Sequence, residues 1–80
     1  MTKEINITYC GSWGYQDKAS SLEAKINKEI HGASVELIKS SGGIFTVSVD
    51  GHEVFNNKKE NVKFPVEEEV IRRIQLHPEI

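Results

Sequence analysis

The spacing of the apolar residues changes twice within the first 40 residues, and this change constrains the fold more than any other feature. Residues 4–10 alternate apolar and polar side chains, which is the period of a half-buried strand. From about Gln16 the apolar residues recur every three or four positions and predict one face of a helix, before residues 33–39 predict a second strand. The helical stripe consists of Ala19, Leu22, Ile26 and Ile30. A strand, a helix and a strand joined this closely form a right-handed unit whose two strands are parallel.

A β-hairpin is predicted in the second half of the chain. Residues 44–49 alternate again, and Asp50-Gly51 is a two-residue turn signal between this run and residues 52–56. Residues 57–61 are interpreted as a solvated, charged connector. Pro65 is expected at the first position of a second helix, because proline needs no backbone N–H partner there. The side chains expected to face inward from this helix are Val66, Val70 and Ile74.

The charges of the second helix follow the helical spacing. Arg72 and Arg73 lie four residues after Glu68 and Glu69, so two ion pairs are expected on its surface. The acidic first turn also suits the helix dipole. His77-Pro78 is expected to end the helix.

These elements predict the order β-α-β-β-β-α. This is the minimal thioredoxin-like α/β arrangement, a mixed four-stranded sheet with two helices that cover the same face or opposite faces. No linker or internal repeat divides residues 1–80, so we expect a single thioredoxin-like domain. Ile38 suggests that its strand is buried on both faces. A chain of this length buries only about 60–65% of its unfolded surface, which predicts a thin core.

Composition excludes several classes of function. The net charge of −2 gives no basic face for nucleic acid, and no apolar run approaches the ~18 residues of a membrane span. A single cysteine excludes an intrachain disulfide, and with no basic-then-apolar leader the cytoplasm is the expected location. His31, His52 and His77 are scattered, so we expect neither a metal site nor a bound cofactor.

The residue with the clearest chemical potential is Cys10, at the end of the first predicted strand. Ligands and chemistry gather at this end of the strands in open α/β sheets. A thiolate there would be stabilised by N–H groups at the helix start, whereas Trp13 packed over the sulfur would disfavour the anion. The sequence does not decide between these effects. An accessible thiol is favoured over a small buried hydrophobic side chain, because Gly11 and Gly14 flank the loop.

The quoted stretch "YCGSWGYQDKASSLEAKI" resembles the opening of the selenoprotein W-like (Rdx) family, which has a strand, then Tyr-Cys-x-x-(Sec or Cys)-Gly-Tyr, then an amphipathic helix. Later, "SGGIFTVSVDGHEVFNNKKENVKFPVEEEVIRRI" resembles the Gly-Gly-x-Phe-x-Val strand, Asp-Gly hairpin and Phe-Pro helix start of the same family. The resemblance runs in one order from about Ile5 to Ile74.

The resemblance implies a thioredoxin-like fold and a redox role with glutathione, as a co-substrate, or with the thiol of a partner protein. By position, Cys10 matches the family's first cysteine and is the candidate catalytic residue. The remainder of the motif loop is Gly11, Ser12, Trp13 and Gly14. The family's glycine loop corresponds to Ser41, Gly42 and Gly43, which become the candidates for binding glutathione or a partner.

Trp13 departs from the family pattern, because it occupies the position of the selenocysteine or second cysteine. A neighbouring thiol normally clears a mixed disulfide, and without it an outside thiol must do so. The first hypothesis is therefore a monothiol redox protein acting through Cys10. The alternative is a redox-inactive binding module that uses the Cys10–Trp13 loop, with Trp13 as an aromatic anchor. Whether the protein is an enzyme, its oligomeric state, and whether Trp13 is native or replaces selenocysteine or cysteine remain open at this point.

Overall fold

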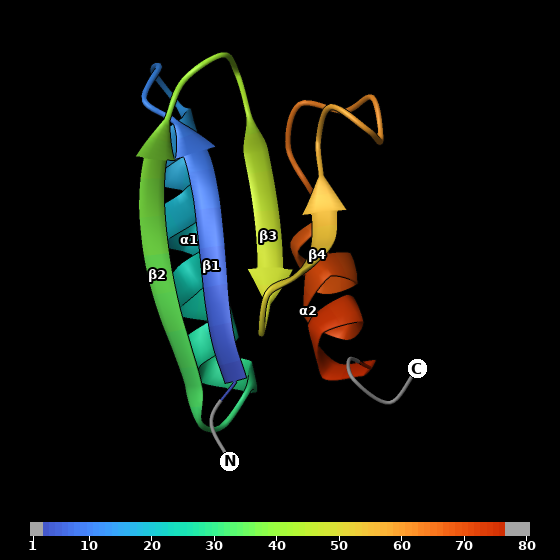
Figure 1. The fold of residues 1–80 in the computed structure, drawn as a ribbon. Helices are drawn as coiled ribbons and strands as arrows, with labels where there is room; N and C mark the ends of the chain where they lie inside the picture. Colours follow the sequence, from blue (N-terminus) through green and yellow to red (C-terminus); the bar gives the residue numbers. More distant parts are fainter. Residues whose placement is uncertain (1–2, 77–80) are drawn as a thin grey trace.

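The computed structural model describes residues 3–76, which form one four-stranded sheet and two helices. In chain order the elements are β1 (Lys3–Cys10), α1 (Tyr15–Glu29), β2 (Ala33–Ser40), β3 (Phe45–Val49), β4 (His52–Asn56) and α2 (Glu67–Leu76). The strands lie in the order β2-β1-β3-β4 (Figure 1). The order and nature of the six elements confirm the α/β prediction. No helix within residues 3–76 is long and apolar enough to cross a membrane.

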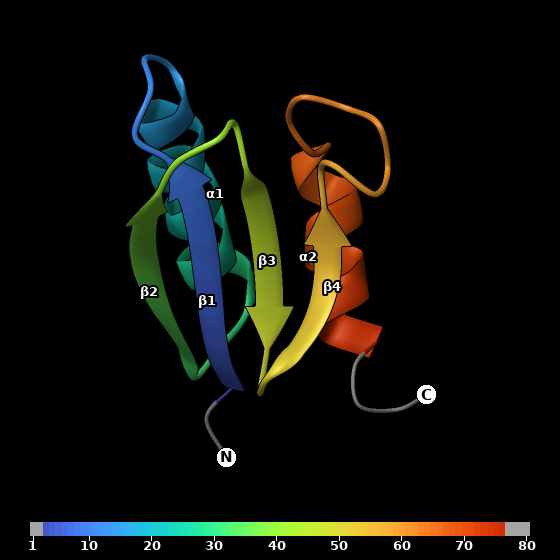
Figure 2. The ribbon, with the colours of Figure 1, turned by 45° about the horizontal axis from the view of Figure 1, so that its top comes forward.

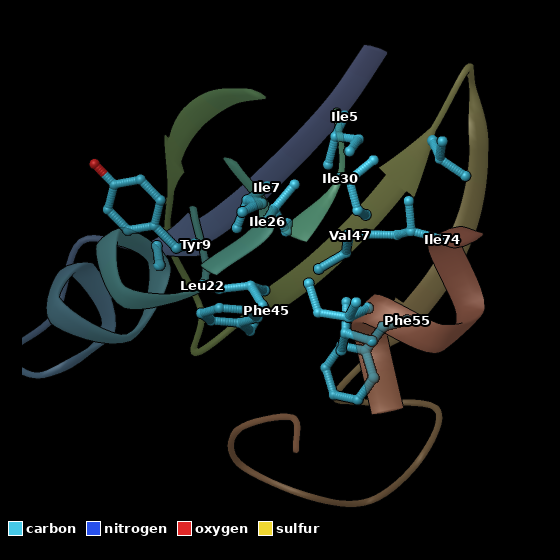
Figure 3. Packing of buried hydrophobic residues seen from close by; sticks show 14 residues of the cluster. Ile5, Ile7, Tyr9, Leu22, Ile26, Ile30, Phe45, Val47, Phe55 and Ile74 are labelled. Atoms are coloured by element: carbon cyan, nitrogen blue, oxygen red, sulfur yellow. The ribbon is translucent and has the colours of Figure 1, made fainter. Parts of the chain in front are cut away.

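Both helices lie on the same face of the sheet, so the molecule has two layers (Figures 1 and 2). α1 packs on β1 and β2, while α2 packs on β4 and touches α1. The core lies between the layers (Figure 3). Its largest fully buried side chains are Phe45, Ile5, Ile7, Leu22, Ile26, Ile74, Val47, Val49 and Val70. Of the two arrangements that the sequence left open, helices on the same face or on opposite faces of the sheet, the structure has the first.

β1 is the central strand and pairs differently with its two neighbours. It runs parallel to β2, with Ile5 opposite Val35, and antiparallel to β3, with Ile7 opposite Val47. Because the side chains of a strand alternate between faces, the apolar set of β1 all points to the helices. The parallel β1–α1–β2 unit predicted from the change in period is confirmed.

The predicted hairpin turn is also confirmed. Asp50 and Gly51 both have positive φ angles, 50° and 85°, as a type I′ turn between twisted strands requires. The carboxylate of Asp50 also accepts a hydrogen bond from the backbone N–H of Glu4 at 3.0 Å. The turn therefore joins β3 to β4 and holds the start of β1 as well.

The expectation that Ile38 marks a strand buried on both faces is wrong. Ile38 is 39% exposed, because β2 is an edge strand and no element within residues 3–76 covers the sheet face opposite the helices. An apolar residue in an alternating strand does not by itself indicate a covering element.

The expected start of the second helix is wrong by two residues. α2 begins at Glu67, and Val66 precedes it with its C=O accepting the Val70 N–H at 3.1 Å. Val66 is 67% exposed and does not face inward, whereas Val70 and Ile74 are buried as predicted. Phe64 takes the inward position instead, with its ring centroid 6.1 Å from that of Phe45.

One of the two predicted ion pairs on α2 forms. Arg73 reaches Glu69 at 3.4 Å as expected, but Arg72 pairs with Glu69 at 3.7 Å rather than with Glu68. Glu68 turns to α1 and meets Lys25 at 3.4 Å, because the two helices lie side by side on the sheet. The predicted helix end at His77-Pro78 lies outside the described residues.

Candidate functional site

Three connecting segments meet at one end of the sheet (Figures 1 and 2). They are the motif loop after β1 (residues 11–14), the glycine loop after β2 (residues 41–44) and the connector from β4 to α2 (residues 57–66). The backbone N–H of Cys10 donates to Ile44 O at 2.8 Å, and that of Gly11 donates to Ser40 O at 2.9 Å. The end of β1 is therefore held from both sides.

The sulfur of Cys10 is surrounded by hydrogen-bonding groups. Its thiol donates to Oγ of Ser12 at 3.2 Å, and the backbone N–H of Ser12 donates to Sγ at 3.4 Å. The backbone of Gly43, from the glycine loop, is a third hydrogen-bond partner of Sγ. When the thiol loses its proton, the Ser12 hydroxyl can rotate and donate to the sulfur, as the Ser12 N–H already does, and donors of this kind favour the thiolate over the neutral thiol.

These contacts lower the pKa of the Cys10 thiol below its ordinary value. The largest cause is the hydrogen bond with the Ser12 side chain, followed by those with the backbone of Ser12 and of Gly43. Burial acts in the opposite direction with a smaller effect, and the positive charge of Lys58 adds a further small lowering. The stabilising groups come from the two loops and not from the start of α1, which the sequence had suggested.

The expectation of an accessible thiol is wrong. Cys10 is only 3% exposed, although the flanking Gly11 and Ser12 are on the surface. Glycines beside a cysteine allow a tight loop, and here the loop folds back over the sulfur rather than opening it to solvent. The thiol is thus polarised but covered.

Trp13 lies away from the sulfur. Its side chain is 96% exposed at the tip of the motif loop, so it neither fills the core nor desolvates Cys10. The next residue, Gly14, has a φ angle of 90° and turns the chain into α1. An exposed indole on a short loop has the character of an interaction residue.

The glycine loop reaches the cysteine through one of its three candidate residues. Gly43, with φ 71°, contacts the sulfur through its backbone, whereas a side chain at Gly42 would meet nothing within 4 Å. A Cβ on Gly43 would approach both Lys58 Nζ and Tyr15 Oη to 3.3 Å. Glycine at this position therefore permits the positive φ and leaves room for both side chains.

The sequence interpretation missed Asn57, which it placed in a solvated connector. The residue is 3% exposed, and its amide Nδ2 donates to Gly43 O at 2.8 Å and Lys63 O at 3.2 Å. Its Oδ1 accepts the backbone N–H of Phe45 at 2.9 Å. The alternation of β4 continues past Phe55 to an inward position at Asn57, and that signal would have indicated its burial.

Asn57 ties the glycine loop to the connector and so holds Gly43 against the sulfur. Within residues 3–76, no group of three histidine, cysteine, aspartate or glutamate side chains comes together to hold a metal ion. Chemically, the site offers one covered thiol with a stabilised thiolate, which suits nucleophilic attack on sulfur once the loop opens.

Comparisons with known proteins agree with this architecture. The model of the Rdx family matches residues 4–76. The crystal structure of a selenoprotein W-related protein from Vibrio cholerae superposes with a TM-score of 0.84 at 21% identity, covering 94% of this chain and 95% of that chain. A protein from Bordetella parapertussis gives a TM-score of 0.69 at 20% identity, covering 96% and 99%. No curated protein sequence matches significantly. The structural likenesses confirm the predicted fold.

Proposed function

This chain belongs to the Rdx family, and from that premise we propose that it is a thiol-redox protein acting through the single thiol of Cys10. Its substrates are disulfides of glutathione or of a partner protein. We place this chemistry in the cytoplasm, where thiol pools keep single cysteines reduced.

The reaction consists of two exchanges that balance without an outside oxidant. The Cys10 thiolate attacks one sulfur of the substrate disulfide, a Cys10–S–S bond forms, and the other sulfur leaves as a thiolate that takes up a proton. A second outside thiol, ionised to its thiolate, then attacks the mixed disulfide. This step releases the Cys10 thiolate and joins the incoming sulfur to the substrate sulfur.

The observation that carries this proposal is the set of hydrogen-bonding groups around Sγ. A structural cysteine in a core needs no polar partners, yet this one has the hydroxyl and N–H of Ser12 and the backbone of Gly43. Lowered pKa values and convergent donors are typical of reactive cysteines.

The covered sulfur adds a condition to the reaction. At 3% exposure, Cys10 cannot meet a disulfide in this conformation, and we propose that residues 11–14, whose Ser12 contacts the sulfur, move to admit it. Ser12 supplies both the cover and the largest stabilisation of the thiolate, so loop opening exchanges its hydrogen bonds for contact with the substrate. The glycines at 11 and 14 make such a movement inexpensive in backbone strain.

A redox-inactive binding module is the second candidate, and the contrast between two exposures favours it. Trp13 is 96% exposed while the thiol three residues earlier is 3% exposed. In this case Trp13 on the motif loop is an aromatic anchor for a partner, and the buried Cys10 only supports the conformation of the loop.

The pH dependence of Cys10 alkylation tests the redox proposal. The folded protein is expected to show a midpoint below that of the chain unfolded in urea, and to form a glutathione adduct with glutathione disulfide at neutral pH. Cys10→Ser is the blank for the mass-spectrometric readout. A midpoint at or above that of the unfolded chain, or a sulfur that reacts only after unfolding, would overturn the proposal and leave the binding module.

The Ser12→Ala variant tests whether the Ser12 hydroxyl lowers the pKa of the Cys10 thiol. The variant loses the side-chain hydrogen bond but keeps the backbone one, so the alkylation midpoint is expected to rise toward its ordinary value. Ser20→Ala, an exposed change on α1, serves as the matched control and leaves the midpoint unchanged. An unchanged alkylation midpoint in Ser12→Ala would show that the Ser12 hydroxyl does not lower the pKa of Cys10.

A further inference from the structure

The lysines of this protein differ in whether a carboxylate neutralises them. Lys25 and Lys59 form ion pairs with glutamates. Lys28, near the far end of α1, and four other lysines have no carboxylate within ion-pair distance among residues 3–76, and these four all belong to the end of the molecule that carries Cys10. They are Lys18, Lys39, Lys58 and Lys63.

Contacts place each of these lysines around the three loops. Lys39 lies over the motif loop, with its Cε 2.6 Å from where a Cβ of Gly11 would be. Lys58 lies beside Gly43, and Lys18 and Lys63 lie over the ring of Phe64 at 5.5 and 5.3 Å from its centroid.

Acidic residues do not balance this charge. Apart from Lys59, which pairs with Glu53, residues 10–18, 39–44 and 57–64 contain four lysines and only two carboxylates, Asp17 and Glu60. Glu60 is already bound to Arg73 at 2.6 Å. A chain with a net charge of −2 therefore concentrates positive charge at one end, where it attracts anions over several ångströms.

A hollow of about 400 Å³ lies within this basic end and opens between α1 and the connector. Lys58 and Lys63 line it together with Tyr15, Asn61 and Gly43. Gly43 links the hollow to the sulfur, because it lines the hollow and its backbone also helps to lower the pKa of the Cys10 thiol. The hollow thus offers the ammonium groups of Lys58 and Lys63 and the amide of Asn61, next to Gly43.

We propose that this hollow is a subsite for a carboxylate of the disulfide substrate, held by Lys58 and Lys63 while the rest of the substrate extends past Gly43 and brings its disulfide to Cys10 once the motif loop has moved. The inference rests on the proposed redox function and names its substrate class, a carboxylate-bearing disulfide. The carboxylate belongs to a small peptide such as glutathione or to an acidic residue beside the cysteine of a partner protein.

Paired disulfides of different charge test the subsite. The rate of mixed-disulfide formation at Cys10 is measured by mass spectrometry with anionic dithiodipropionate and neutral bis(2-hydroxyethyl) disulfide. The rate with the anionic disulfide is divided by the rate with the neutral one, and this ratio is divided by the same ratio for a small free thiol, which corrects for the intrinsic reactivity of the two disulfides. The wild type is expected to prefer the anion about tenfold at low salt, which corresponds to about 1.4 kcal/mol shared between two surface ion pairs.

The Lys58→Gln/Lys63→Gln double variant is expected to lose that preference. Because both rates share one thiolate, a change in the pKa of Cys10 cancels from the ratio. Lys28→Gln is the matched control, since Lys28 is an exposed lysine without an ion pair near the far end of α1. A wild-type ratio equal to that of the free thiol, or a preference that survives in the double variant, overturns the subsite while leaving the redox function standing.

A second measurement needs no reaction at sulfur. S-Methylglutathione and a short acidic peptide are titrated separately into the labelled protein, and amide shifts are followed by NMR. Saturable shifts at Gly43 and Asn61 that the double variant loses support the subsite even if Cys10 proves inert. The probe that produces them identifies the source of the carboxylate. The absence of shifts with both probes overturns the inference.

Discussion

Cys10 and Asn57 are both 3% exposed, and each is surrounded by hydrogen bonds of a different kind. The thiol of Cys10 sits among groups that favour its anion, which is a chemical arrangement. The amide of Asn57 satisfies three backbone groups that would otherwise be buried without partners, which is a structural one. Both residues interact with Gly43 in the glycine loop, so a change at either one is expected to alter the surroundings of Gly43.

Asn57→Ala is expected to destabilise the fold by about 2–4 kcal/mol, because it strands backbone groups of Phe45, Gly43 and Lys63. Urea unfolding measures the loss. Asn27→Ala, on the exposed side of α1, is the control and leaves the free energy of unfolding within about 0.5 kcal/mol. Equal stability of Asn57→Ala and the wild type would mean that water replaces the amide.

At the scale of elements, the connector from β4 to α2 is held at several points along its length. Phe64 inserts its ring beside Tyr15, at 5.1 Å between centroids, and Asn57 fixes the beginning. Between them Glu60 accepts from Arg73, whose guanidinium also donates to Val54 O at 2.9 Å. These ties keep Lys58 and Lys63 beside the glycine loop.

The Glu60–Arg73 pair predicts a pH dependence. The hydrogen bond from Arg73 holds the pKa of Glu60 below its ordinary value of 4.5. A lowered carboxyl pKa adds stability above the ordinary pKa, and this stability is lost as the pH falls through the lower, folded value. Because the Glu60 side chain is 37% exposed, the contribution is under about 1 kcal/mol.

Glu60→Gln is therefore expected to unfold more easily than the wild type near neutral pH, with the difference shrinking as the pH falls below 4.5 and through the lower pKa of Glu60 in the folded protein. Urea unfolding at a series of pH values gives the two curves. Glu36→Gln on the exposed face of β2 is the control, since Glu36 makes no ion pair within residues 3–76. A difference that stays constant with pH would contradict this explanation.

At the scale of the whole molecule, all the distinctive surface chemistry lies at one end. The core occupies the space between the sheet and the two helices. Cys10 is the last residue of β1, and the exposed Trp13 and the basic hollow lie at the same end of the molecule. The exposed side chains of this end, unlike the buried Asn57, can thus be changed with little effect on the core.

Trp13→Ser is accordingly expected to change the free energy of unfolding by no more than about 0.5 kcal/mol, because the side chain makes almost no contact with the fold. In the wild type, acrylamide is expected to quench the tryptophan fluorescence equally well in the folded and the unfolded protein. Quenching that weakens as the protein concentration rises would instead reveal that a second copy covers the indole.

Local patterns in the sequence determined the elements and their order. Alternation and helical spacing predicted β1, α1 and β3, the Asp50-Gly51 pair predicted the hairpin, and position predicted that Cys10 lies at a strand end. These features depend on residues that are close together in the chain, so the amino-acid sequence alone shows the spacing that determines them.

Only the tertiary structure decided which groups surround the sulfur and that both helices cover the same face of the sheet. Cys10 and Gly43 are distant in the chain, and they meet because β1 and β2 run parallel and end together. The burial of Asn57, the exposure of Val66 and the gathering of unpaired lysines likewise follow from how three loops pack at one end. A linear pattern carries no record of such contacts, since each depends on residues from separate elements.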